Sequence, residues 1–306
     1  MAGRRVIDDS AVLVDGPWVH RDVSANGVRF HVAELGTGPL VLLLHGFPQF
    51  WWTWRAQIVA LAAAGYRVVA PDLRGYGASD KPPRGYDQAG LSADVVGLIR
   101  ALGESDAAIV GHDWGGVLAV STAVLRPAVV RRIAMLGIAH PLAMRSAIVR
   151  RPQGQFGASS YLLGFQLPWQ PERRLVRNDA RWVAELLALW GGPGYPDPEA
   201  ERRYRDAMQI LYVPHRSLEY YRWFVRSQLR PDGHRFSRAL REPVPVPTLH
   251  IHGALDRCVL ASTARASGRY VAAAYEWLLI DGVGHFPHEE AADRVNGELV
   301  RWLKDG

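Results

Sequence analysis

The stretch Gly111-His112-Asp113-Trp114-Gly115-Gly116, GHDWGG in one-letter code, directly follows the apolar run Ala107–Val110. An apolar run of this length is typical of a buried strand. Small residues around a reactive one are typical of a sharp strand-to-helix turn, usually written G-x-S-x-G. Asp113 stands where that pattern has a serine. The stretch therefore predicts a strand, a tight turn and a helix, with a carboxylate in the place of the usual nucleophile.

Similar apolar runs alternate with helical patterns on both sides of this stretch. Trp18–Ser24 and Val28–Ala33 flank Asn26-Gly27, a strong signal for a β-hairpin. The other expected strands are Leu40–Leu44, Arg67–Ala70, Ala107–Val110, Arg132–Leu136, Pro247–His252 and Tyr275–Ile280, and the helices between and after them are 53–64, 88–102, 115–125 and 289–304. Alternation of strand and helix indicates a mostly parallel, twisted sheet flanked by helices.

The alternation stops after residue 138 and resumes near residue 243. The segment between is rich in tryptophan, tyrosine and arginine and shows helical patterns at 179–190, 198–212 and 217–229. It ends in Glu242–Pro247, where three prolines favour a stiff, extended connector. The sequence therefore predicts an α/β core made of residues 1–138 and 243–306, with an inserted α-helical cap over residues 139–242.

Composition narrows the class of protein. A chain of 306 residues suits one α/β core with an insertion. No apolar run of about 18 residues occurs, and residues 1–16 alternate charged and apolar residues without a long apolar stretch, which argues against export. We therefore expect a cytoplasmic protein without a transmembrane segment. The net charge is +6, but 34 of the 36 basic residues are arginine and no nucleic-acid or zinc motif occurs, so we expect no nucleic-acid partner. The single cysteine, Cys258, cannot form an internal disulfide, and we expect it to pack in the core.

Four expected strands are each followed by a short segment whose residues could take part in catalysis. The four segments are His45-Gly46-Phe47-Pro48, GHDWGG, Gly253-Ala254-Leu255-Asp256 and Gly282-Val283-Gly284-His285-Phe286. Because parallel strands place their ligands at their carboxyl ends, these segments are expected to converge. They supply a nucleophile, an acid and a histidine in chain order, namely Asp113, Asp256 and His285. Asp281 is an alternative for the acid, and His288 is an alternative for the histidine.

These segments carry a family resemblance. Together with the turn Asp72–Pro82 (DLRGYGASDKP), they resemble the epoxide hydrolases of the α/β-hydrolase fold over almost the whole core, and less firmly over the cap. That family uses two cap tyrosines to hold the epoxide oxygen. The resemblance implies Tyr161, in YLLGFQLP at 161–168, and Tyr221, in EYYR at 219–222, with Tyr220 as the alternative register.

A carboxylate nucleophile limits the types of reaction that the protein could catalyse. Its attack on an ester or amide carbonyl would give a more reactive anhydride, whereas attack on a saturated carbon gives an ordinary alkyl ester. Water could cleave that ester with His285 as general base, oriented by Asp256. The backbone N–H groups of Phe47 and Trp114 would stabilise the oxyanion on Asp113.

We therefore expect an enzyme that converts epoxides into vicinal diols. Its reactants would be a small apolar epoxide, contacting Phe47, Trp114, Tyr161 and Tyr221, and water. No metal or organic cofactor is expected, because side chains and water suffice for this route. A homodimer is compatible with the sequence.

Other functions share parts of this pattern. Haloalkane dehalogenases also have Asp followed by Trp, but typically carry Asn in place of Phe47. Fluoroacetate-type dehalogenases share HGFPQ but carry Arg where this chain has Trp114. A catalytically inactive, ligand-binding hydrolase fold would be marked by loss of Asp113, Asp256 or His285, and none is lost.

Overall fold

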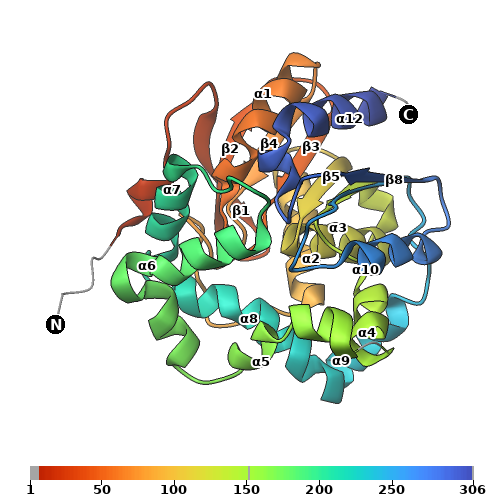
Figure 1. The fold of residues 1–306 in the computed structure, drawn as a ribbon. Helices are drawn as coiled ribbons and strands as arrows, with labels where there is room; N and C mark the ends of the chain where they lie inside the picture. The colour runs from red at the N-terminus through yellow and green to blue at the C-terminus, as the bar shows by residue number, and fades with distance from the viewer. Residues whose placement is uncertain (1–6, 151, 305–306) are drawn as a thin grey trace.

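An eight-stranded sheet forms the centre of the computed structural model, which describes residues 7–150 and 152–304 (Figure 1). The strands are β1 Val19–Ala25, β2 Val28–Leu35, β3 Leu40–Leu44, β4 Arg67–Pro71, β5 Ala107–His112, β6 Val130–Leu136, β7 Thr248–Gly253 and β8 Tyr275–Ile280. Their order across the sheet is β1-β2-β4-β3-β5-β6-β7-β8. The pairs β1–β2 and β2–β4 are antiparallel and all other pairs are parallel, so the expected mostly parallel sheet is confirmed.

The hairpin at one edge of the sheet and the strands at its centre both have clear physical causes. Asn26 and Gly27 both have positive φ, 48° and 73°, which is the geometry of the hairpin turn that Asn-Gly favours. The central strands β3 and β5 are buried along their whole length, as expected for parallel strands covered on both faces. Both the hairpin and the central strands were therefore predictable from short-range sequence signals.

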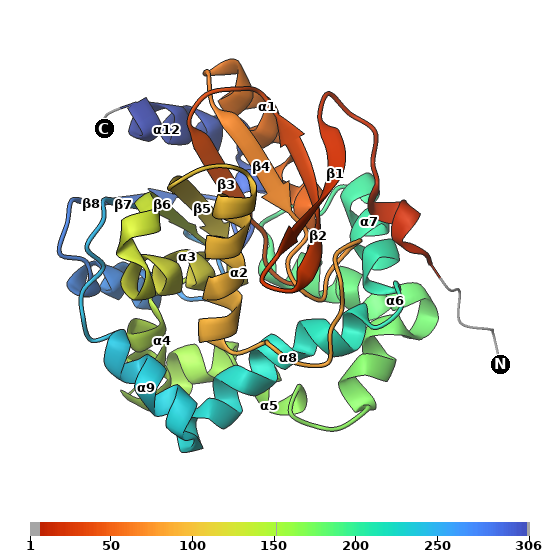
Figure 2. The same cartoon turned by 180° about the vertical axis from the view of Figure 1, so that it is seen from behind.

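Core helices cover both faces of the sheet. They are α1 Arg55–Ala63, α2 Gln88–Ala101, α3 Trp114–Leu125, α10 Ala261–Arg265, α11 Pro287–Glu290 and α12 Ala292–Lys304, with a short 3₁₀ helix, η2 Trp51–Trp54, before α1. Helices α1 and α12 pack together on one face, and α2 and α3 pack together on the other (Figures 1 and 2). The central strands are therefore shielded from water on both sides.

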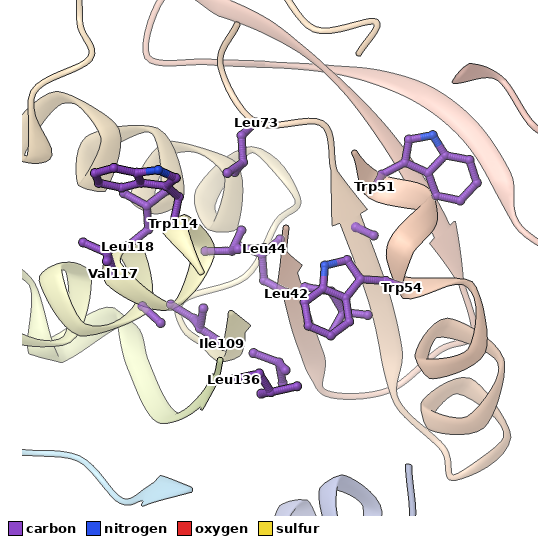
Figure 3. Packing of buried hydrophobic residues seen from close by; sticks show 14 of the residues in the cluster. Leu42, Leu44, Trp51, Trp54, Leu73, Ile109, Trp114, Val117, Leu118 and Leu136 are labelled. Carbon is purple, nitrogen blue, oxygen red and sulfur yellow. The ribbon is translucent and has the colours of Figure 1, made fainter. Parts of the chain in front are cut away.

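The core between these layers includes strand leucines and isoleucines. Figure 3 shows Leu42, Leu44, Ile109 and Leu136 lying between Trp114 of α3 and the labelled Trp51 and Trp54 of η2. The four strand side chains are fully buried. This packing fixes the ends of β3, β5 and β6, from which the predicted site segments emerge.

The chain between β6 and β7 forms helices, which we call the cap helices. They are α4 Pro141–Arg150, a π-helical turn Pro152–Phe156, α5 Tyr161–Gly164, α6 Gln170–Trp190, α7 Pro198–Met208, α8 Val213–Arg226 and α9 Pro231–Ala239. They lie together at one end of the sheet (Figures 1 and 2). No cap helix or core helix in the described residues has the length and apolar character needed to cross a bilayer.

The cap helices differ in detail from the sequence expectation. Helices α4, α5 and α9 were not predicted, although Pro141 and Pro231 open α4 and α9 at the position where proline favours a helix start. Helix α6 begins earlier than predicted and is broken at Arg177–Ala180, where three residues have positive φ. The helix predicted at 198–212 ends at Met208, and the next begins at Val213 rather than at residue 217.

A buried carboxylate joins the cap helices to the core. Glu289, on α11, accepts hydrogen bonds from Tyr195 and Tyr204 of the cap and from Gln49 of the core, the last at 3.0 Å. It also pairs with Arg55. The Glu289 side chain is only 2% exposed, so these partners, rather than water, stabilise the buried carboxylate.

We predict that Glu289→Ala lowers the free energy of unfolding by about 2–4 kcal/mol, because Arg55 and two tyrosine hydroxyls lose their shared partner. Chemical denaturation measures the change. The control is Glu185→Ala, since Glu185 forms an exposed pair with Arg181, and its removal should cost less than about 1 kcal/mol. Equal effects of the two substitutions would contradict the role given to Glu289.

Candidate active site

Asp113 occupies a strained turn between β5 and α3. Its backbone has φ 49° and ψ −115°, and its N–H donates to the carbonyl of Leu136 on the neighbouring strand at 3.1 Å. The turn is tight because a Cβ at Gly115 would lie 1.9 Å from the carbonyl oxygen of Leu44. Only glycine fits at position 115, and the turn therefore holds the Asp113 side chain at a fixed place above the sheet.

The segment after β3 supplies a donor to this carboxylate. The backbone N–H of Phe47 donates to Asp113 Oδ1 at 3.0 Å. This approach requires glycine at position 46, because a Cβ there would lie 2.5 Å from Asp113 Cβ. Burial raises the pKa of the Asp113 carboxyl, and the positive charge of His285 and the N–H groups of Phe47 and Trp114 offset only part of that rise.

His285 lies between the two acids. Its Nδ1 is 2.8 Å from Asp256 Oδ2, and its Nε2 is 3.8 Å from Asp113 Oδ2. Nε2 is buried and has no hydrogen-bond partner in the described part of the chain. Burial alone would lower the pKa of His285, but the charge of Asp256 outweighs it and holds the pKa well above the usual value.

Asp256 is itself held in place by the backbone. Its Oδ1 accepts the N–H groups of Cys258 and Val259 at 2.8 and 2.9 Å, which leaves Oδ2 for His285. The alternative acid, Asp281, is exposed. The geometry therefore brings Asp256, and not Asp281, to His285.

The alternative histidine is engaged elsewhere. His288 Nε2 is 2.6 Å from the hydroxyl of Thr53, and its ring lies 4.4 Å from that of Trp54. Burial and the charge of Arg55 hold the pKa of His288 well below its usual value. His288 is therefore part of the packing between α11 and η2.

A cavity of about 50 Å³ opens above Asp113. Its lining residues are Asp113, Trp114, Val117, Ile138, Ala139, Pro141, Met144, Ser159, Tyr161, Leu162, Tyr221, Phe224, Cys258 and Val259. Most of these side chains are apolar, which suits an apolar ligand. In the described residues, no group of three or more His, Cys, Asp or Glu side chains is arranged to hold a metal ion.

The two cap tyrosines implied by the resemblance both reach this cavity. The rings of Tyr161 and Tyr221 lie 6.0 Å apart, centre to centre. Burial raises the pKa of both hydroxyls well above the usual value, with the charge of Asp113 adding to the effect, so both remain hydrogen-bond donors at neutral pH. Tyr220 instead donates its hydroxyl to the carbonyl of Arg74 at 2.8 Å, and it belongs to the contact between α8 and the Asp72–Pro82 turn.

Cys258 has a more specific place than the core packing expected from the sequence. Its thiol lines the cavity and lies 3.3 Å from the Tyr161 hydroxyl. Burial raises the pKa of the thiol, so it stays protonated. Its position two residues after Asp256 is the sequence signal that could have placed it here.

Glu290 was also missed by the sequence analysis. Its Oε2 accepts the N–H groups of Gly192 in the cap and Gly284 in the core, at 2.8 and 2.7 Å, and its Oε1 accepts that of Phe286 at 2.9 Å. Gly284 and Phe286 flank His285. One carboxylate thus fixes the histidine segment and joins it to the cap, and no local pattern in the sequence indicates this.

Comparisons with known proteins show the family to which the chain belongs. The model of the alpha/beta hydrolase family matches residues 41–298. The chain is 34% identical to the AB hydrolase superfamily protein YfhM of Bacillus subtilis, over 92% of this chain and 97% of that protein. It is 31% identical to epoxide hydrolase A of Mycobacterium tuberculosis, over 94% of this chain and 98% of that protein. The chain belongs to the epoxide hydrolase family.

A solved structure supports the same membership. The crystal structure of an epoxide hydrolase from Vigna radiata superposes with a TM-score of 0.82 at 28% identity, over 95% of this chain and 98% of that one. The resemblance to epoxide hydrolases and the expected α/β-hydrolase fold are therefore confirmed. The roles of individual residues in this family member stay predictions.

We predict that Asp256→Asn lowers the pKa of His285. Loss of the negative charge removes the largest of the effects that oppose burial, and burial favours the neutral imidazole. Titration of the imidazole by NMR measures the shift. Asp281→Asn is the matched control, because Asp281 is exposed and lies outside the site. A shift in the control as large as in Asp256→Asn would contradict the pairing.

Proposed function

We propose that this protein hydrolyses epoxides to vicinal diols through an ester formed on Asp113. The observation that supports this most strongly is the arrangement of one cavity, in which a carboxylate faces two tyrosines and lies 3.8 Å from an unpartnered histidine nitrogen. A carboxylate in the nucleophile position suits attack on saturated carbon, and paired hydroxyl donors suit a leaving oxygen that stays attached to the substrate.

In the first step, Asp113 Oδ2 attacks an epoxide carbon, and the bond from that carbon to the epoxide oxygen breaks. Oδ1 stays on the N–H of Phe47, 3.0 Å away, so Oδ2 is the free nucleophile. Tyr161 and Tyr221 hold the developing alkoxide, and one of their two hydroxyls gives it a proton, which that tyrosine regains when the Asp113 carboxyl group is restored. We propose that residues 139–242 act as the cap that supplies these two donors.

In the second step, water attacks the acyl carbon of the ester. His285 Nε2 takes the proton from the water, and Asp256 stabilises the resulting imidazolium. The bond from that carbon to the ester oxygen then breaks, the diol leaves with the proton that His285 has taken from the water, and the Asp113 carboxyl group is restored. The negative charge that develops on Oδ1 is held by the N–H groups of Phe47 and Trp114, each such donor being worth about 10²–10³ in rate. Ester formation removes the negative charge of Asp113, which favours the neutral His285 that this step requires.

A dehalogenase is the second candidate. The indole nitrogen of Trp114, which lines the cavity, is buried without a hydrogen-bond partner in the described residues and could hold a halide ion. The same nucleophile would then displace halide from a saturated carbon. The two tyrosines favour the epoxide, since a departing halide needs no proton.

An assay of diol formation from a panel of epoxides, with halide release from haloalkanes measured in parallel, separates the candidates. We expect diol formation without halide release. Asp113→Ala should lower diol formation by at least about 10⁴-fold, as removal of a covalent nucleophile does in other triads. Diol formation that survives Asp113→Ala would contradict the proposal, and absence of both reactions would favour a ligand-binding protein.

We predict that Tyr161→Phe and Tyr221→Phe each lower kcat/KM for epoxides by about 10- to 100-fold, and that the double substitution lowers it by about 10²–10⁴-fold. The reason is loss of the donors to the epoxide oxygen. Tyr220→Phe, the control, removes only the bond to the Arg74 carbonyl and should leave kcat/KM within about threefold. A loss in Tyr220→Phe equal to that in Tyr221→Phe would show that the register is wrong.

A further inference from the structure

A pocket of about 440 Å³ lies on the outer surface of the cap, along α6. Four of the eight side chains that line it are arginines, all of them exposed, namely Arg173, Arg174, Arg177 and Arg181. Glu185 is the one acid among these lining residues. None of the eight lines the cavity above Asp113, so this space, which we call the arginine pocket, lies outside the candidate active site.

The course of α6 gathers these cations around one space. Arg177 lies four residues after Arg173 and three after Arg174, so the three side chains share one face of the helix. Leu175, between them in the sequence, is buried. The helix is then broken at Arg177–Ala180, and Arg181 in its second part lines the same pocket. Both parts of α6 therefore supply guanidinium groups to it.

Three of the four guanidinium groups have no acidic partner. Within the described residues, Arg173, Arg174 and Arg177 form no ion pair, whereas Arg181 pairs with Glu185 at 3.0 Å. The cap does not leave its arginines unpaired in general. On α7 three consecutive pairs lie within 4.0 Å, namely Arg202 with Asp206, Arg203 with Glu199 and Arg205 with Glu201.

The unpaired cations favour an anion as ligand. Like charges three or four residues apart on a helix repel each other, and an anion in the pocket would remove that repulsion. One of the groups is already held in place, because the guanidinium of Arg174 stacks over the ring of Trp182, 3.9 Å from its centre. A guanidinium fixed in this way loses little freedom when it binds.

We propose that the arginine pocket binds the phosphate group of a small, soluble ligand. The guanidinium fork donates two parallel hydrogen bonds to phosphate oxygens, and several forks can share one phosphate group. The volume of about 440 Å³ lies within the range of ~300–1,000 Å³ typical of small-molecule sites, so the pocket has room for a phosphorylated compound. The site is independent of the proposed epoxide hydrolysis.

Isothermal titration calorimetry with inorganic pyrophosphate, at physiological ionic strength, tests the site. We expect the wild-type protein to bind with a Kd below about 1 mM. Arg173→Gln and Arg177→Gln, combined in one chain, should each weaken binding by about tenfold or more, because each removes a hydrogen bond between charged groups. Neither side chain has a hydrogen-bond or ion-pair partner in the described residues, so the variant should fold normally, which circular dichroism checks.

The matched control combines Arg235→Gln and Arg238→Gln on α9. These arginines are also exposed and have no acidic partner in the part of the chain that the structure describes, but they do not line the arginine pocket. The control loses the same charge and should bind pyrophosphate within about threefold of the wild type, because distant exposed charges are screened. Equal losses in the two variants would show only a general attraction to a cationic protein and would overturn the pocket.

Lipid headgroups are the other source of phosphate groups. Leu167 and Trp169, just before α6, are 46% and 73% exposed, so contact with a bilayer has to be tested. Sedimentation with phosphatidylglycerol vesicles separates the sources, and we expect no binding to the vesicles, since the cations line a pocket of small-molecule size. Vesicle binding without pyrophosphate binding would overturn the soluble ligand, and binding of neither probe would overturn the phosphate site.

Discussion

The strained turn at Asp113 is the constraint on which the site depends. A positive φ at a non-glycine residue costs about 1–3 kcal/mol, and it persists only where the surroundings determine the backbone. Here the buried strand β5 leads into the turn, Leu136 accepts its N–H, and the close contact of Gly115 with Leu44 prevents the chain from relaxing. The turn brings a carboxylate within reach of Phe47 from one strand end and His285 from another.

The cap is bound to the core through the same segments that hold the proposed catalytic groups. The backbone N–H of His285 donates to the carbonyl of Trp190 at 2.9 Å, and Glu290 bonds both to Gly192 in the cap and to Gly284 beside His285. Displacement of the cap would break these hydrogen bonds. The position of the histidine and the position of the cap therefore depend on each other.

The sequence predicted those features of the fold and of the candidate site that depend on local patterns of residues. The Asn26-Gly27 hairpin, the buried strands and the order of the three triad candidates follow from turn chemistry, apolar runs and the topology of parallel sheets. The choice between Tyr220 and Tyr221 does not follow from local pattern. Neighbouring residues on a helix point about 100° apart, and only packing sets the rotation of α8. Glu290 was missed for a related reason: its partner Gly192 lies far away in the chain, and no periodic signal marks such a contact.

The proposed reaction requires that Asp113 forms an ester and that water cleaves this ester at the acyl carbon. A single turnover with an epoxide in water enriched in heavy oxygen tests it most directly, followed by mass spectrometry of the diol and of the peptide that contains Asp113. We expect heavy oxygen to enter the Asp113 carboxyl group and the diol of this first turnover to carry none. Heavy oxygen found only in the diol would show direct attack of water on the epoxide and would rule out the ester on Asp113.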